Sequence, residues 1–286
     1  MGETWTVLRI LQWTAGHFAQ KGIEGGRLDA ELLLGDTLGL DRVGLYMNFD
    51  RPLTPEELGR FRQQVQRRAG REPLAYIQGE TEFWSLPLRV GPDVLIPRPE
   101  TEILVEEALK RATPSSIVLD VGTGSGAIAV ALSHELPGAS VTGFDISPGA
   151  LQVAAENARR NGVQGRLKWI AGDLARLPAG PYDLIVSNPP YIPKGEMAGL
   201  MPEVGGFEPH LALCGGADGL DCYRHLARQA PGCLRSGGWL LLEVGAGQDN
   251  AVRDLLDRAG LTETFCRADY AGIGRVVGGR LSDQDI

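Results

Sequence analysis

Short apolar segments alternate with helical segments from residue 116 to the C-terminus, and this alternation constrains the fold most strongly. Strands are expected over residues 117–121, 140–145, 166–171, 182–187, 239–244, 261–266 and 274–279. Helices are expected over residues 127–136, 148–160, 221–234 and 250–259. The pattern predicts an α/β fold with a doubly wound, mostly parallel seven-stranded sheet. Because no helix separates the last two strands, they should form an antiparallel hairpin at the sheet edge.

The first 75 residues show helical spacing and no convincing strand. Apolar side chains recur from Val7 to Phe18, and a leucine-rich segment suggests a second helix. Thr54-Pro55-Glu56-Glu57 forms a capping box with proline at the first helical position, so another helix begins there. We therefore expect a small helical bundle over residues 1–75 that docks a partner. A hairpin linker over 76–95 and a larger α/β domain over 96–286 should follow.

The net charge of −8 is concentrated in the larger domain. Residues 1–90 carry 11 Lys and Arg against 12 Asp and Glu, whereas the remainder carries 17 against 24. A surface that grips nucleic acid needs a basic field, so direct nucleic-acid binding is not expected. The basic stretch from Arg60 to Arg71 is interpreted as the solvated face of a helix, or alternatively as a contact for an acidic or RNA-bearing partner.

Cysteine usage and hydropathy give no sign of secretion, membrane association or a metal. The four cysteines contain no C-x-x-C pair, and no histidines cluster near them. No apolar run approaches the roughly 18 residues of a membrane span. We expect a reduced cytoplasmic protein that needs no metal.

A glycine loop follows the first expected strand of the sheet. Its residues are Gly122, Thr123, Gly124, Ser125 and Gly126. Glycines let the backbone approach a ligand closely, but the G-x-G-x-G spacing differs from the G-x-G-x-x-G of dinucleotide sites. Asp120 precedes the loop, where a carboxylate could hold a cationic amino group directly or through water and would repel a phosphate. These features favour S-adenosylmethionine as the cofactor, with S-adenosylhomocysteine as the product that it becomes after methyl transfer.

Acidic residues end the next two expected strands. A carboxylate at Asp145 can accept hydrogen bonds from both ribose hydroxyls. Asp173 is placed to accept from the adenine exocyclic amine, and Leu174 offers a backbone N–H or an apolar contact. The recurrence of acidic residues at successive strand ends beside a glycine loop predicts a cofactor site.

Asn188-Pro189-Pro190-Tyr191 directly follows the expected strand over 182–187. Two prolines cannot continue a ladder, so the chain leaves the sheet after Asn188. Asn188 Oδ1 and the Pro189 carbonyl can accept both N–H groups of a planar amide or amine, and Tyr191 can pack on its flat face. Together with S-adenosylmethionine, this arrangement predicts methylation of a conjugated nitrogen, with Asn188, Pro189 and Tyr191 as the catalytic residues.

Longer blocks along essentially the whole chain resemble the release factor glutamine methyltransferases, the PrmC/HemK family. They are Arg71-Glu72-Pro73-Leu74-Ala75-Tyr76-Ile77, Leu95-Ile96-Pro97-Arg98-Pro99-Glu100-Thr101-Glu102, Asn188-Pro189-Pro190-Tyr191-Ile192, Glu208-Pro209-His210-Leu211-Ala212-Leu213, Gly215-Gly216-Ala217-Asp218-Gly219-Leu220-Asp221 and Asp269-Tyr270-Ala271-Gly272-Ile273-Gly274-Arg275.

The resemblance implies a class I, Rossmann-like methyltransferase domain over residues 96–286. It implies methyl transfer to the side-chain N5 of glutamine in the Gly-Gly-Gln loop of class 1 peptide chain release factors, with the helical domain helping to dock them. Family cofactor contacts fall on the glycine loop, Asp145, Leu174 and Asn188; position 174 is often tryptophan in the family, which puts adenine stacking there in doubt. Substrate contacts fall on Asn188, Pro189, Pro190 and Tyr191. Pro97, Arg98 and Glu100 either wall the methionine end of the cofactor or form a structural turn.

Three other functions are weighed against this one. An adenine-N6 methyltransferase shares the N-P-P-Y motif, but the acidic larger domain disfavours it. A dehydrogenase is disfavoured by the glycine spacing. A non-catalytic adaptor that binds release factors is disfavoured because Asp145 and Asn188 are intact. We expect a monomer.

Overall fold

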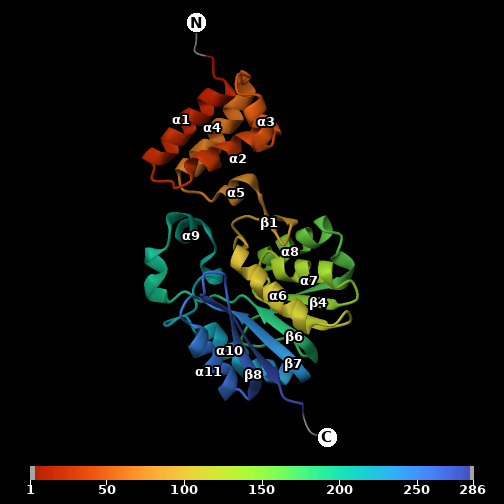
Figure 1. The fold of residues 1–286 in the computed structure, drawn as a ribbon. Helices are drawn as coiled ribbons and strands as arrows, with labels where there is room; N and C mark the ends of the chain where they lie inside the picture. The colour runs from red at the N-terminus through yellow and green to blue at the C-terminus, as the bar shows by residue number, and fades with distance from the viewer. Residues whose placement is uncertain (1–3, 284–286) are drawn as a thin grey trace. The chain divides into compact units, whose positions relative to one another are not determined.

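The computed structural model describes residues 4–283, which divide into two compact units (Figure 1). A helical unit contains residues 4–79 and the distant segment Met201–Phe207, and a sheet unit contains the rest. This division differs from the domain boundaries at residues 75 and 95 that the sequence predicts. Ile77 lies in the helical core, whereas Phe83 and Leu88 of the hairpin lie in the core of the sheet unit.

The helical unit is a bundle whose long helices begin where the sequence predicts. The capping box at Thr54 is present, with the hydroxyl accepting from the Glu57 N–H and the Glu57 carboxylate accepting from the Thr54 N–H. Apolar side chains such as Leu11, Phe18 and Phe61 are buried together at its centre. The short α3 was not foreseen. The helices are α1 (Val7–Gln20), α2 (Gly26–Leu38), α3 (Arg42–Met47), α4 (Pro55–Ala69) and α5 (Leu74–Gln78).

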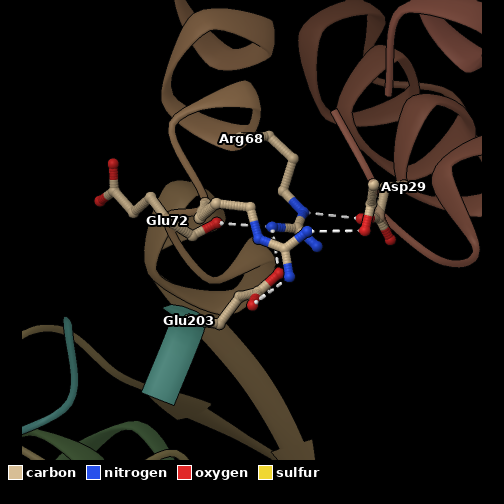
Figure 2. Close-up of polar contacts among 6 residues, drawn as sticks. Asp29, Arg68, Glu72 and Glu203 are labelled. Carbon is tan, nitrogen blue, oxygen red and sulfur yellow. Dashed lines mark hydrogen bonds and ion pairs between the residues drawn. The ribbon is translucent and has the colours of Figure 1, made fainter. Parts of the chain in front are cut away.

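An ionic cluster joins the distant helix α9 (Pro202–Phe207) to this bundle (Figure 2). Arg68 Nε donates to Asp29 at 2.7 Å, and its Nη1 lies 3.1 Å from Glu203 Oε1. Arg71 Nη2 donates to the other Glu203 oxygen at 2.8 Å. Only 9% of the Arg68 side chain is exposed. The interpretation of Arg68 as part of a solvated helix face was therefore wrong, because its side chain is buried and pairs with carboxylates from two other segments.

Replacing Arg68 with alanine should destabilise the helical unit by about 3 kcal/mol, because Asp29 would remain largely buried without this partner and Glu203 would keep only Arg71. Urea unfolding followed by circular dichroism measures the loss. Arg62→Ala, on the exposed side of the same helix, is the matched control and should change stability by less than about 0.5 kcal/mol. Equal stabilities of the two variants would show that the cluster contributes nothing.

The sheet unit contains a seven-stranded sheet in the order β5-β4-β3-β6-β7-β9-β8 (Figure 1). The first five strands in this order are parallel, and β9 runs antiparallel to both neighbours. The predicted sheet and its antiparallel closing pair are confirmed, with β9 inserted between β7 and β8. A separate hairpin pairs β1 with β2. The strands are β1 (Glu80–Phe83), β2 (Leu86–Arg89), β3 (Ile117–Val121), β4 (Ser140–Asp145), β5 (Leu167–Ala171), β6 (Tyr182–Ser187), β7 (Leu234–Glu243), β8 (Leu261–Ala268) and β9 (Gly274–Leu281).

Helices cover both faces of this sheet. Val118 points to a core shared with α6, α7 and α8, whereas its neighbour Leu119 points to a core shared with α10 and α11. This alternation along one strand is expected when both faces are buried. None of the helices in residues 4–283 has the length and apolar content to cross a bilayer. The covering helices are α6 (Glu102–Arg111), α7 (Ala127–Glu135), α8 (Pro148–Arg160), α10 (Asp221–Cys233) and α11 (Asp249–Arg258).

Two local predictions differ from the structure. Strand β7 begins at Leu234, because Leu234 pairs with Tyr182 before an irregular stretch and regular pairing resumes at Trp239. The segment from residue 190 to 218, where no helix or strand is predicted from the sequence, contains short helical turns: η3 (Lys194–Gly199), α9, and η4 (His210–Ala212). These turns have too few residues to produce a recognisable helical period.

Candidate active site

The carboxyl ends of the parallel strands lie level at one edge of the sheet. Val121 pairs with both Phe144 and Ser187, and Asp145 pairs with Ala171. The chain winds in opposite directions on either side of the β3–β6 pair, so the strand order reverses there. In open α/β sheets, ligands bind outside the strand ends at such a switch point.

A cavity of about 390 Å³ opens at this switch point, within the sheet unit. This volume falls in the range of about 300–1,000 Å³ that is typical of small-molecule sites. The cavity brings together eight of the predicted site residues: Gly122, Gly124, Asp145, Asp173, Leu174, Asn188, Pro189 and Pro190. The predicted residues Asp120, Thr123, Ser125, Gly126 and Tyr191 are not among its lining residues.

The glycine loop adopts a conformation that needs its glycines. Gly122, Gly124 and Gly126 all have positive φ, at 70°, 54° and 80°. A side chain at Gly126 would also meet Ala154 of α8, whose Cβ would lie 2.9 Å from the new Cβ. The first two glycines therefore expose backbone to the cavity, while the third lets α8 pack against the loop.

Asp120 lies below the glycine loop and is fully buried. Thr123 Oγ1 donates to its carboxylate at 2.6 Å. Burial raises the pKa of Asp120 to about 7, against the opposing effects of Thr123 and the Ala129 N–H in the first turn of α7. This geometry fastens the loop to the end of β3. Contact of Asp120 with a cofactor stays a prediction.

Asp145 is the acidic side chain that the structure holds most firmly at the cavity. Its carboxylate accepts from the backbone N–H of Gly124 and of Ser147, both at 2.9 Å. Asp173 is exposed and accepts from the Ala175 N–H at 2.7 Å. Gln229 of α10 fixes the same loop by donating to the Leu174 carbonyl at 2.6 Å.

The N-P-P-Y segment leaves β6 beside the glycine loop. The Asn188 carbonyl oxygen would lie 4.0 Å from a Cβ placed on Gly122. Beyond the prolines, Gln248 donates to the Tyr191 carbonyl at 2.9 Å. The Ile192 N–H donates to the Leu213 carbonyl, and the Ile192 carbonyl accepts from the Gly215 N–H. The Tyr191 ring packs against Gly245, where an added Cβ would meet its Cδ2 at 2.9 Å.

A buried carboxylate joins two of the sequence blocks across 110 residues. Glu208, 3% exposed, accepts from Arg98 Nη2 at 2.5 Å and from the Ile96 N–H at 3.1 Å. Arg98 therefore has a structural partner. The cavity is lined by Asp93, Val94 and Leu95, which precede this turn, and not by Pro97, Arg98 or Glu100.

Sequence reasoning missed several parts of this site. Asp93 and Val94 carry no motif, Leu95 begins a family block without a role assigned to it, and only the tertiary fold brings these three residues to the cavity. Glu243 ends β7 and is 3% exposed, close to Asn188 and Thr101. A carboxylate at the end of an expected strand is the signal used for Asp145, and it could have identified Glu243 as well.

The residues at the cavity fit S-adenosylmethionine by their chemistry. The glycine loop lets a ligand come close to the backbone, and the Asp145 carboxylate can accept hydrogen bonds from a ribose. The rest of the cavity wall is largely apolar and includes Phe144 and Leu174. None of its lining residues is a lysine or arginine of the kind that commonly binds phosphate. The site therefore suits a cationic nucleoside cofactor better than a dinucleotide.

Two family models match the chain. Residues 9–79 match the PrmC N-terminal domain, and residues 99–200 match the methyltransferase small domain. A release factor glutamine methyltransferase from Geobacter sulfurreducens is 52% identical over 281 residues, covering 98% of each chain. The chain belongs to the release factor glutamine methyltransferase family.

Other relatives agree with this membership. The release factor glutamine methyltransferase of Cereibacter sphaeroides is 48% identical, over 93% of this chain and 95% of its own. Among solved structures, a methyltransferase from Pyrococcus furiosus is similar in fold, with a TM-score of 0.52 and 17% identity over 69% of this chain and 89% of its own. Members of the release factor glutamine methyltransferase family use S-adenosylmethionine, and this chain is such an enzyme.

Proposed function

We propose that this protein transfers a methyl group from S-adenosylmethionine to the side-chain N5 of glutamine in the Gly-Gly-Gln loop of class 1 peptide chain release factors. The observation that carries the proposal is Asn188, which lines the cavity beside the glycine loop in a chain of this family. The bound cofactor supplies an electrophilic methyl on a sulfonium. The residues of the chain position the cofactor and the acceptor nitrogen relative to each other.

The roles of the cofactor residues follow from their positions. Gly122 and Gly124 let the cofactor approach the backbone, and Asp145 accepts from the ribose hydroxyls. Asp173 and Leu174 flank the adenine at the end of β5. Asp120, Thr123, Ser125 and Gly126 act mainly by holding the loop in place.

The acceptor nitrogen is held at the end of β6. Asn188 Oδ1 and the Pro189 carbonyl accept its two N–H groups, and Pro190 and Tyr191 shape the slot. An amide nitrogen is a poor nucleophile because its lone pair is delocalised over the carbonyl. Fixing the nitrogen in line with the methyl can contribute about 7–11 kcal/mol at best. The methylated nitrogen is cationic and releases its proton to water, so no histidine base is needed.

The partners follow from the same proposal. The helical unit docks the release factor. The protein acts in the cytoplasm, because release factors act on ribosomes there, and it acts as a monomer. Direct nucleic-acid contact is not expected for a chain with a net charge of −8.

Incubation with radiolabelled S-adenosylmethionine tests the proposal. The acceptors are a class 1 release factor, its variant with alanine in place of the Gly-Gly-Gln glutamine, and an adenine-containing oligonucleotide. We expect label only in the unmodified release factor. Label in the alanine variant, or only in the oligonucleotide, would overturn the glutamine assignment. Tight binding of the release factor without any transfer would instead identify an adaptor.

A further inference from the structure

Glu243 is a buried carboxyl beside Asn188. Ser187 of β6 pairs with Leu242 of β7, so the next residues along the chain, Asn188 just after β6 and Glu243 at the end of β7, lie at the same level. Only 3% of Glu243 is exposed, and its Oε2 atom has no hydrogen-bond partner within the described chain. Burying a carboxylate is costly without full pairing. Its position next to the acceptor slot suggests a role in the reaction.

The contacts of Asn188 fix the orientation of its amide group. Asn188 Nδ2 donates to Thr101 Oγ1 at 3.2 Å, and Asn188 and Thr101 both lie near the Glu243 carboxyl and favour its ionised form. An ionised carboxylate accepts hydrogen bonds and cannot donate them, so it favours the NH2 group of Asn188, and not the oxygen, on its side of the amide. The NH2 group, held by Thr101, is then directed into the protein. Asn188 Oδ1 is left for the cavity that the residue lines.

We propose that Glu243 is a positioning residue that acts through Asn188. Together with Thr101, its carboxylate holds Asn188 Oδ1 toward the acceptor nitrogen, and its negative charge favours the positive charge that develops on that nitrogen. The inference rests on the proposed function, since it needs an acceptor nitrogen bound at Asn188.

The charge movement in methyl transfer explains why Glu243 would affect the rate. The nitrogen lone pair forms the C–N bond as the S–C bond breaks, so positive charge moves from sulfur to nitrogen, and the nitrogen then loses a proton to water. An interaction accelerates this step only if it is stronger in the transition state than before it. Glu243 meets this condition through the amide dipole of Asn188, whose oxygen accepts one of the two N–H groups of the acceptor nitrogen, and that N–H becomes more acidic as the nitrogen gains positive charge.

The surroundings of Glu243 contain both signs of charge. Arg275 of β9 favours the ionised form, whereas Glu100 of η1 (Pro99–Thr101) opposes it. Tyr191 and Tyr223 also face the carboxyl, and the Tyr223 hydroxyl donates to the Glu243 backbone carbonyl at 3.0 Å. Burial raises the pKa of Glu243 to about 7. The carboxyl is therefore neutral at lower pH, and a glutamine at this position imitates that neutral state.

Glu243→Gln tests the role of the charge while keeping the size of the side chain. We expect kcat to fall by about 10- to 100-fold, while the dissociation constant for S-adenosylmethionine changes by less than about threefold. In the wild type, kcat/KM should fall as the pH decreases through about 7, and this acidic limb should be absent from Glu243→Gln. Asp120 has a pKa in the same range, so a limb that persists in Glu243→Gln would assign it to Asp120.

Thr101 variants test the contact network. Thr101→Val should lower kcat, and Thr101→Ser, which keeps the hydroxyl, should restore most of it. Wild-type kcat and an unchanged acidic limb in Glu243→Gln would overturn the inference. So would a loss of cofactor binding or of melting temperature as large as the loss of rate, because that result indicates a purely structural role. By contrast, a wild-type enzyme that transfers no methyl to a release factor would overturn the proposed function. The variants would then be compared on whichever acceptor the wild type does methylate.

Discussion

Asn188→Ala is expected to lower kcat by about 10³-fold or more while leaving cofactor binding largely intact. The substitution removes the oxygen that orients the acceptor nitrogen, whereas the glycine loop and Asp145 remain in place on other strands. Single-turnover kinetics with a release factor measures the chemical step. Isothermal titration calorimetry with S-adenosylmethionine measures cofactor affinity.

Asn250→Ala provides the matched control for this experiment. Asn250 is an exposed asparagine on α11, and its loss should leave both measurements unchanged. If Asn188→Ala weakened cofactor binding as much as it slowed turnover, Asn188 would be a cofactor ligand and not the residue that holds the acceptor.

Asp145→Ala should raise the dissociation constant for S-adenosylmethionine by about 100-fold or more, because hydrogen bonds to a charged group contribute about 1.5–3 kcal/mol each. The carboxylate would lose its bonds to the ribose and its support of the Gly124 and Ser147 backbone. Calorimetric titration of the purified variant checks this. At saturating cofactor, kcat should recover much of its wild-type value, since Asp145 lies away from the acceptor slot.

Two further variants separate the functions of Asp145. Asp145→Asn keeps an oxygen acceptor and should bind the cofactor more tightly than Asp145→Ala. Asp173→Ala removes an exposed carboxylate and should weaken binding by less than about tenfold. An Asp145→Ala protein with wild-type affinity would mean that the ribose lies elsewhere.

Much of the fold could be predicted because it follows from local patterns and connection rules. Apolar periodicity identifies the strands, and right-handed parallel crossovers bring their carboxyl ends to one edge. Residues at or just after the ends of strands, such as Asp145 and Asn188, are therefore recognisable as site candidates from their position alone. The small antiparallel hairpin was predictable for the same reason, since no helix separates its strands.

Other features depend on contacts between segments far apart in the chain. The pairing of Arg68 with Glu203 spans 135 residues, and it converts an apparently solvated arginine into a buried one. The pairing of Arg98 with Glu208 likewise gives a structural partner to a residue that the motif alone leaves ambiguous. No periodicity marks such partners, because charged residues follow the same helical spacing whether their side chains meet water or a distant carboxylate.

The sequence by itself determined the parallel sheet and the glycine loop, and it predicts Asn188 as the residue that holds the acceptor nitrogen. These features depend on which residue types stand at the ends of the strands, and the local sequence decides where each strand ends. Only the tertiary structure decided which way the Asn188 amide faces. That orientation depends on Thr101, which accepts from the Asn188 amide, and on the nearby carboxyl of Glu243, and both residues lie on other elements.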